Sequence, residues 1–234
     1  MSLAQRHQMR VLSERATAQA APGSTVDRAT SNAHALIRAK LDTDRRRLKA
    51  VQSIERKIEI KREVLPEYTQ YVDGVLAAGN GVQDDVLGYV MCWRIDAGDY
   101  AGALDIARYV LQHDILLPDR FERTTATLIA EEPAIAALKA CDGDKPFDLD
   151  VLHQVFELTA ERDMPDQVRA KLHFAIGRHM AKAGDDDTGA LQHLRRAVEL
   201  HDKVGAKKDI EQLERKLRNA SGEAGKKQPP KSGT

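Results

Sequence analysis

Paired carboxylates recur along the chain and are the residues whose types and spacing come nearest to a catalytic site. A metal-dependent nuclease needs two or three carboxylates converging on Mg²⁺, usually with a Lys or His beside them. No Lys or His stands at motif spacing here, and each pair lies at a predicted helix start or turn, where acidic side chains cap backbone N–H groups. Capping therefore explains the pairs, and we predict no catalytic residue. The pairs are Asp84 with Asp85, Asp96 with Asp99, Glu131 with Glu132, and Asp185 to Asp187.

The remaining reactive side chains match no cofactor or metal pattern. His173 and His179 are six residues apart, which places them on different faces of a helix, whereas zinc sites use i,i+4 histidines or paired cysteines. The sequence has no GxxxxGK[ST] phosphate-binding loop, so ATP hydrolysis is not expected. Cys92 and Cys141 lie in or at the end of helical patterns, which favours two reduced thiols over a disulfide. We predict no metal and no cofactor.

Charge is unevenly distributed along a chain whose formal net charge is zero. Residues 1–63 hold 14 Lys or Arg against 7 Asp or Glu, a net charge of +7, and residues 203–234 hold 9 against 4, a net charge of +5. The middle therefore carries −12. Such a chain can attract a polyanion at its ends while its body repels it.

Four basic side chains in the N-terminal region form a stripe. Arg45, Lys49 and Arg56 follow Arg38 by 7, 11 and 18 residues, and at about 100° per residue they fall on one line along a helix. Such a stripe suits the phosphates of a DNA duplex. A solvated outer helix face is the commoner explanation of basic stripes in general.

The elements that carry these side chains are predicted to be helices throughout. Aromatic content is 4%, Gly and Pro gather between periodic stretches, and Ala, Leu, Glu, Arg and Lys dominate within them, so the fold class is all-α. One long helix is expected from the region of Asp27 to Ser31 as far as Leu65, with an imperfect coiled-coil-like seam. A further helix begins at Pro66 and ends at Gly79.

The centre of the chain, residues 83–111, predicts a helical hairpin. Asp84 and Asp85 open a first helix that Gly98 stops, and a second helix with a broad apolar stripe follows at once. Trp93 is the large apolar anchor of this hairpin. The same Gly-Asp turn and stripe recur about 87 residues later, after Gly184, which predicts a second hairpin resembling tetratricopeptide-type units, both within one globular unit.

Other segments give weaker signals. Residues 114–127 show no clear period, and a short helix is expected at 134–140. Two more helices follow, the second beginning at Pro165. A short helix with Ile210, Leu213 and Leu217 comes last. The tail beyond Asn219 is expected to be disordered and basic.

Several of these stretches carry a resemblance to a known family. The segment from Gln83 to Leu111 is similar to the pattern QDD…VM.WR.D.GD..GAL.IARY of the small terminase subunits of tailed temperate bacteriophages with cohesive-end genomes. The match extends to AQRHQMRV at residues 4–11, to LP…Y..GVL..G.G at 65–81, and to ELTAERDMPDQVRAKLH at 157–173. Most of the chain is covered by this long, gapped pattern.

The resemblance implies a function in viral DNA packaging. A small terminase subunit binds double-stranded DNA at the cohesive-end site as a homo-oligomeric ring and recruits the large subunit, which holds the ATPase and nuclease. Members are also labelled the endonuclease subunit of terminase, so a Mg²⁺ nuclease whose carboxylates converge only in the fold is the alternative, and a helical scaffold without DNA binding is a second one. With no signal sequence and no apolar run of membrane-spanning length, we expect the protein in the host cytoplasm without membrane contact.

The resemblance and the charge of +7 together favour DNA contact for the N-terminal cations. The expected regions are 1–64 for DNA binding, 65–205 as an acidic body for oligomerisation, and 206–234 as a short helix and basic tail. Arg28, Asn32 and His34 are the residues expected nearest to any base contacts. The predicted DNA-binding residues are Arg28, Arg38, Lys40, Arg45, Arg46, Arg47, Lys49, Arg56 and Lys57.

Overall fold

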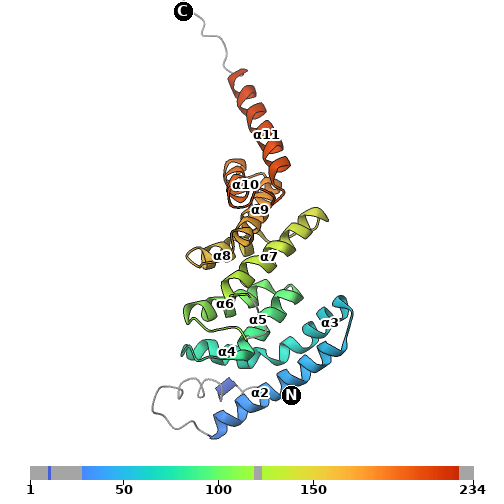
Figure 1. Cartoon of the computed structure of the whole chain (residues 1–234), viewed down its shortest axis with the longest axis vertical. Coiled ribbons are helices and arrows are strands. Elements are labelled where there is room, and N and C mark those ends of the chain that lie inside the picture. Colours follow the sequence, from blue (N-terminus) through green and yellow to red (C-terminus); the bar gives the residue numbers. More distant parts are fainter. Residues whose placement is uncertain (1–9, 12–27, 119–122, 227–234) are drawn as a thin grey trace, which may run out of the picture. The chain divides into compact units, whose positions relative to one another are not determined.

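The computed structural model describes residues 10–11, 28–118 and 123–226, with only the backbone described at 28–33 and 221–226. Its regular elements in these ranges are helices joined by loops (Figure 1), which confirms the all-α class. The chain forms two compact units, Met1–Thr125 and Ala126–Thr234. The predicted regions 1–64, 65–205 and 206–234 differ from each other in charge and expected role rather than in packing, and they stay a prediction. No described helix is both long and apolar enough to cross a membrane.

The long N-terminal helix expected up to Leu65 is wrong, because the chain breaks after Ala50. Helix α2 spans Arg28–Ala50 and α3 spans Ile54–Val64. Ser53 is extended, and its side chain accepts a hydrogen bond from the Arg56 N–H at 3.3 Å, so it caps α3. The two helices fold back on each other as a hairpin (Figure 1), tied by an ion pair of 2.7 Å between Arg47 and Glu63.

A short 3₁₀ turn, η1 (Leu65–Glu67), leads into α4 (Thr69–Ala78). Gly79 ends α4 with a φ of 67°, in the left-handed conformation that glycine adopts without strain. The helix predicted from Pro66 to Gly79 is therefore confirmed in extent, with its first turn tightened to 3₁₀.

The hairpin predicted at 83–111 is confirmed by helices α5 (Asp85–Ala97) and α6 (Tyr100–Gln112). Asp84 caps α5, and Gly98 ends it at a φ of 82°. The Asp99 side chain then caps α6 through the Gly102 N–H. Trp93 is 3% exposed and packs edge-on against Tyr68, with ring centroids 5.8 Å apart. It is the apolar anchor that the sequence indicated.

The second unit begins with α7 (Thr125–Asp142), which is much longer than the short helix expected at 134–140. Pro133 lies inside it and removes one backbone hydrogen bond. The small buried side chains Ala130, Ala134 and Ala137 lie around the proline at helical spacing, and their burial offsets that loss. Helix α8 (Leu149–Thr159) follows, in the place expected for a helix before Pro165.

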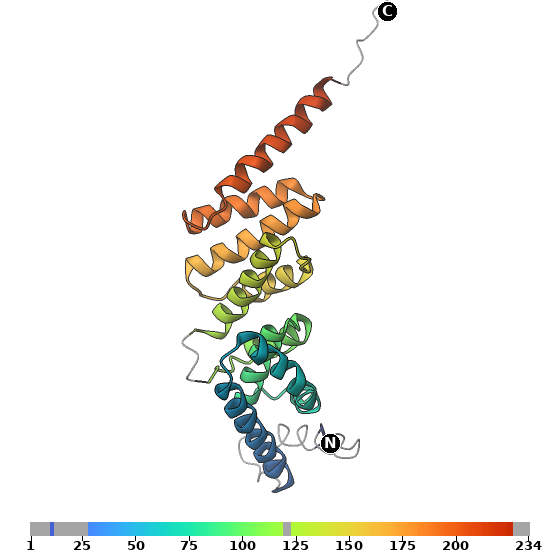
Figure 2. The same ribbon diagram turned by 90° about the vertical axis from the view of Figure 1, so that its right-hand side faces the viewer.

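Helices α9 (Asp166–Ala183) and α10 (Asp187–Leu200) form the second predicted hairpin and lie side by side (Figure 2). Gly184 has a φ of 78°, and the Asp186 side chain caps α10 through the Gly189 N–H, as Gly98 and Asp99 do in the first hairpin. The repeat in the sequence therefore corresponds to the same turn structure in both hairpins. The two hairpins lie in different units, however, and their likeness to tetratricopeptide-type units stays a prediction.

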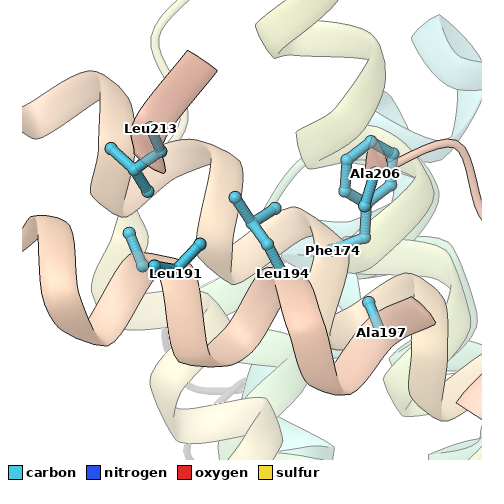
Figure 3. Close-up of a cluster of buried hydrophobic side chains, with 7 residues drawn as sticks. Phe174, Leu191, Leu194, Ala197, Ala206 and Leu213 are labelled. Carbon is cyan, nitrogen blue, oxygen red and sulfur yellow. The ribbon is translucent and has the colours of Figure 1, made fainter. Parts of the chain in front are cut away.

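Helix α11 (Lys207–Lys226) packs its apolar face on this hairpin. Figure 3 shows the shared core, in which Leu213 of α11 approaches Leu191 of α10. The helix continues beyond Asn219, so the disorder expected from that residue is wrong up to Lys226. Ala220, Glu223 and Ala224 are compatible with helix and extend one that the core has already nucleated. Residues 227–234 of the predicted tail lie outside the described part. The core residues are Phe174, Ala190, Leu191, Leu194, Ala197, Ala206 and Leu213.

Candidate nucleic-acid interface

The fold of the α2–α3 hairpin creates a hollow lined mainly by cations, which we call the basic hollow. Its volume is about 610 Å³. Three basic side chains come from α2 and two from α3, so positive charge faces the hollow from both helices. Its lining residues are Asp42, Arg45, Arg46, Leu48, Lys49, Lys57, Lys61 and Trp93.

The cations of the basic hollow differ in how far protein groups neutralise them. Lys61 forms an ion pair with Asp96, and Arg45 lies 3.3 Å from Asp42 while its guanidinium sits 4.5 Å above the Tyr89 ring. Arg46 donates to the hydroxyl of Thr43 and to no carboxylate in the described chain.

Lys49 and Lys57 are the least neutralised cations at this site. Within the ranges 28–118 and 123–226, no carboxylate lies within ion-pair distance of either ammonium group. An unneutralised ammonium in a concave surface attracts an anion more strongly than one paired within the protein. Phosphate groups are anions of this kind.

Beneath the cations the hollow has an apolar floor. It consists of Leu48, which is 8% exposed, and Trp93, which is 3% exposed and packs against the Tyr68 ring. The hollow therefore combines a charged rim with an apolar base. A ligand that carries both phosphate and flat apolar surface matches this combination.

The structure breaks up the basic stripe predicted from the sequence. Arg56 lies on α3, beyond the turn at residues 51–53, and forms an ion pair with Glu59. Arg38 lies 3.6 Å from Asp85 at the start of α5. Arg45 and Lys49 remain together in the hollow. The four residues therefore do not form one line, because the helix that would align them ends at Ala50.

The other predicted DNA-binding residues also fall into two groups. Arg46 and Lys57 line the hollow. Lys40 instead contacts Asp44 at 2.9 Å and Glu67 at 3.3 Å, and Arg47 joins α2 to α3 through Glu63. Arg28 begins α2, and its side chain, like that of Asn32, lies outside the described part.

Sequence reasoning missed Lys61 as a member of this site. It follows Lys57 by four residues, so the two share one face of α3. This signal was present in the sequence, but it points to the hollow only once α3 is known to fold back on α2.

Two buried tyrosine–carboxylate bonds hold α2 against the rest of the first unit. Tyr68 donates to Asp44 at 2.7 Å. Tyr71 donates to Asp84, and the ring nitrogen Nδ1 of His34 lies 3.0 Å from the same hydroxyl. His34 is thus engaged with the protein rather than free at the helix start.

Burial sets the ionisation of this cluster. It raises the pKa of the Asp84 carboxyl, although hydrogen bonds from Tyr71 and from the Val86 N–H act in the opposite direction. Burial, together with the neighbouring Asp84, also raises the pKa of the Tyr71 hydroxyl, which stays protonated as a donor. These contacts have a structural role, since they hold α2 against the rest of the first unit.

Most carboxylates considered for catalysis have capping or ion-pair roles. Asp84, Asp99 and Asp186 cap α5, α6 and α10, as predicted. The expectation that every pair lies at a helix start or turn is wrong for Glu131 and Glu132, which lie inside α7. The ion pairs are Asp85 with Arg38, Asp96 with Lys61, Glu131 with Lys171, and Asp187 with Lys216.

Two histidines of the second unit, His173 and His193, contact each other and an aromatic ring. The Nδ1 atoms of His173 and His193 lie 3.0 Å apart, with both rings edge-on to Phe156. Burial and the neighbouring His193 lower the pKa of His173 to about 4, so the pair is neutral at pH 7. His179 donates to the Ala137 carbonyl at 2.9 Å, in different surroundings from His173.

Metal and thiol chemistry have no assembled site in the described ranges. No three His, Cys, Asp or Glu side chains gather there closely enough to hold a metal ion. Cys92 and Cys141 are free thiols, as predicted.

Comparison with known proteins agrees with the resemblance to small terminase subunits that the sequence of the central hairpin, residues 83–111, shows. Residues 38–167 match the family model described as phage small terminase subunit. A terminase endonuclease subunit of Escherichia phage P2 is 48% identical over 219 residues, which cover 93% of this chain and 86% of that protein. A probable terminase endonuclease subunit of Haemophilus phage HP1 is 24% identical over 208 residues, covering 83% of this chain and 73% of that protein.

No solved structure is significantly similar to the chain. The family match covers more than half of the sequence, including α3 to α8, and the P2 relative extends it over nearly the whole chain. The chain therefore belongs to the phage small terminase subunit family and is a terminase subunit with a role in DNA packaging.

Proposed function

We propose that this terminase subunit binds phage DNA at the cohesive-end site through the basic hollow. The convergence of Arg45, Arg46, Lys49, Lys57 and Lys61 on one concave surface supports this proposal. Phosphate neutralisation by Lys and Arg supplies the sequence-independent part of DNA affinity. Sequence recognition needs base contacts besides these.

Removing the two unneutralised lysines should weaken DNA binding measurably. We expect Lys49→Gln with Lys57→Gln to lower the affinity for cohesive-end DNA about tenfold at moderate salt. The slope of log K against log salt should fall by about 0.9 for each phosphate that the variant no longer neutralises. Titration by fluorescence anisotropy at several salt concentrations measures both quantities.

A matched control separates local contact from net charge. Lys139 and Lys145 are also exposed and have no carboxylate partner among the described residues, so Lys139→Gln with Lys145→Gln changes the charge equally. The control should bind DNA like the unmodified protein. Equal salt slopes in both double variants would show that the hollow does not contact DNA. If the unmodified protein does not bind DNA at all, the alternative of a helical scaffold is favoured.

The names of both relatives favour nuclease activity as the second candidate function. The carboxylates that could hold Mg²⁺ are dispersed over several helices, and those with described contacts act in capping or in ion pairs. Incubation of the purified subunit with Mg²⁺ and cohesive-end DNA, without the large subunit, decides between the two. We expect intact DNA, whereas specific nicks would establish an endonuclease.

We also propose that the subunit forms a closed homo-oligomeric ring in the host cytoplasm. The charge pattern supports this, because basic ends and a body of −12 within each copy permit head-to-tail contacts between unlike surfaces. Such heterologous contacts close into rings when the rotation between copies allows it. Light scattering at micromolar concentration and moderate salt should give a single molar mass that is a whole-number multiple, greater than one, of the 26.0 kDa chain mass. A monomeric mass would exclude the ring.

The C-terminal end is the proposed contact for the large terminase subunit. Ile210, Leu213 and Leu217 in the first part of α11 pack on the core. The sequence beyond them carries net positive charge, which suits recognition by a partner protein. Deleting residues 220–234 should abolish capture of the large subunit in a pull-down experiment and leave DNA affinity intact. A deletion of 227–234 alone tests whether the last described helical turns suffice. Weakened DNA binding with intact capture would instead make this end a second DNA contact.

A further inference from the structure

We infer that the basic hollow accepts a single strand of DNA, with its phosphates at the rim and a base against the floor, rather than an intact duplex. The inference rests on the proposed function, since it specifies the form of DNA that enters the hollow. It is argued from the shape and lining of the basic hollow, to which α2, α3 and Trp93 of α5 contribute.

The size and walls of the hollow favour one strand. A volume of about 610 Å³ lies within the range of about 300–1,000 Å³ typical of small-ligand sites. A duplex, whose major groove alone is about 12 Å wide, does not enter such a space. Arg46 on α2 and Lys57 on α3 would contact a strand from opposite sides, because their helices form the two walls.

The floor favours a strand with unstacked bases. A duplex presents phosphates outward and keeps its bases stacked, so it leaves the apolar floor of Leu48 and Trp93 uncovered. A single strand can bring a base to this surface while its phosphates meet the cations, which is how proteins commonly bind single strands. Arg45, held above Tyr89, adds a guanidinium plane that can stack on a base.

Trp93 allows a direct test, because it is the only tryptophan in the sequence and lines the hollow. The probes are a single-stranded oligonucleotide and a blunt duplex with the same number of phosphates. We expect the single strand to change Trp93 emission and to bind at least about tenfold more tightly than the duplex. Its salt slope should be about 0.7 per neutralised phosphate. Lys49→Gln with Lys57→Gln should weaken single-strand binding about tenfold, and Lys139→Gln with Lys145→Gln should not.

The outcomes distinguish this inference from the proposed function. If the duplex binds as tightly as the single strand and both depend on Lys49 and Lys57, the single-strand inference is overturned while DNA binding at the hollow stands. If tight single-strand binding leaves Trp93 emission unchanged and is insensitive to the two lysines, the strand binds elsewhere and the inference also fails. If neither DNA depends on these lysines, the hollow loses its role in the proposed function as well. Circular dichroism confirms that the variants are folded.

Discussion

Replacing Asp84 with alanine should lower the free energy of unfolding of the first unit by about 3 kcal/mol, because it removes two buried interactions at once. The carboxylate caps α5 through the Val86 N–H at 2.8 Å and accepts the hydroxyl of Tyr71. Alanine leaves that hydroxyl without its acceptor in a site where Tyr71 is 4% exposed. Urea unfolding followed by Trp93 fluorescence reports this unit, since Trp93 packs within it.

Two further variants show whether burial produces this cost. Asp84→Asn keeps a capping oxygen and removes a charge whose burial is unfavourable, so its cost should be less than half that of alanine. Asp148 caps α8 through the Asp150 N–H at 2.9 Å but is exposed. Asp148→Ala, followed by circular dichroism, should therefore lose only the cap, about 1 kcal/mol. Equal costs for Asp84→Ala and Asp148→Ala would show that the bond to Tyr71 contributes nothing.

The two hairpins were predictable because local signals determine them. A helix stop at Gly98 or Gly184, followed within two residues by an aspartate cap, specifies both the turn and the next helix. The apolar stripes after each turn then require the helices to pack on each other. These signals lie within a few residues, so no tertiary information is needed to interpret them.

The break at residues 51–53 was missed because its local signal is weak. The helical pattern of residues 27–65 contains no Gly or Pro before Pro66, and a single Ser53 cap competes with continued helix by only about 1 kcal/mol. Packing of α3 against α5 decides between the two, and this contact is not readable from sequence. In α7, similarly, burial outweighs the cost of Pro133, so the helix extends well beyond the short segment expected at 134–140.

For the candidate site as well, local sequence signals predict some of the residues, whereas their arrangement depends on tertiary packing. The sequence identified the region rich in cations, including Arg45, Arg46, Lys49 and Lys57. It could not show that Lys61 and Trp93 share a hollow with them, because the hollow exists only when α3 folds back on α2. The same fold assigns Arg38 and Arg56 to ion pairs outside the hollow.

In the second unit, Leu194→Ala should lower the free energy of unfolding by about 3 kcal/mol, which lies within the range of losses typical of replacing a fully buried leucine with alanine. Leu194 is 0% exposed and lies at the centre of the core formed by α9, α10 and α11 (Figure 3). It packs directly on Gly177, where a Cβ atom would lie 2.8 Å from Leu194 Cγ. Chemical unfolding followed by circular dichroism measures the loss.

A double-mutant cycle with Gly177→Ala tests the cause of this cost. Alone, Gly177→Ala overpacks the contact but gains helix propensity, so we expect a net cost of about 1 kcal/mol. After Leu194→Ala the two closest atoms, both of the leucine, are gone, and the Ala190 carbonyl oxygen at 3.0 Å is the tight contact that remains. The new methyl group at residue 177 then borders the space that the leucine leaves. The double variant should therefore be more stable than the sum of the single losses by at least about 1 kcal/mol. Strict additivity would mean that helices α9 and α10 move apart to relieve the contact, so that Gly177 does not set their close approach.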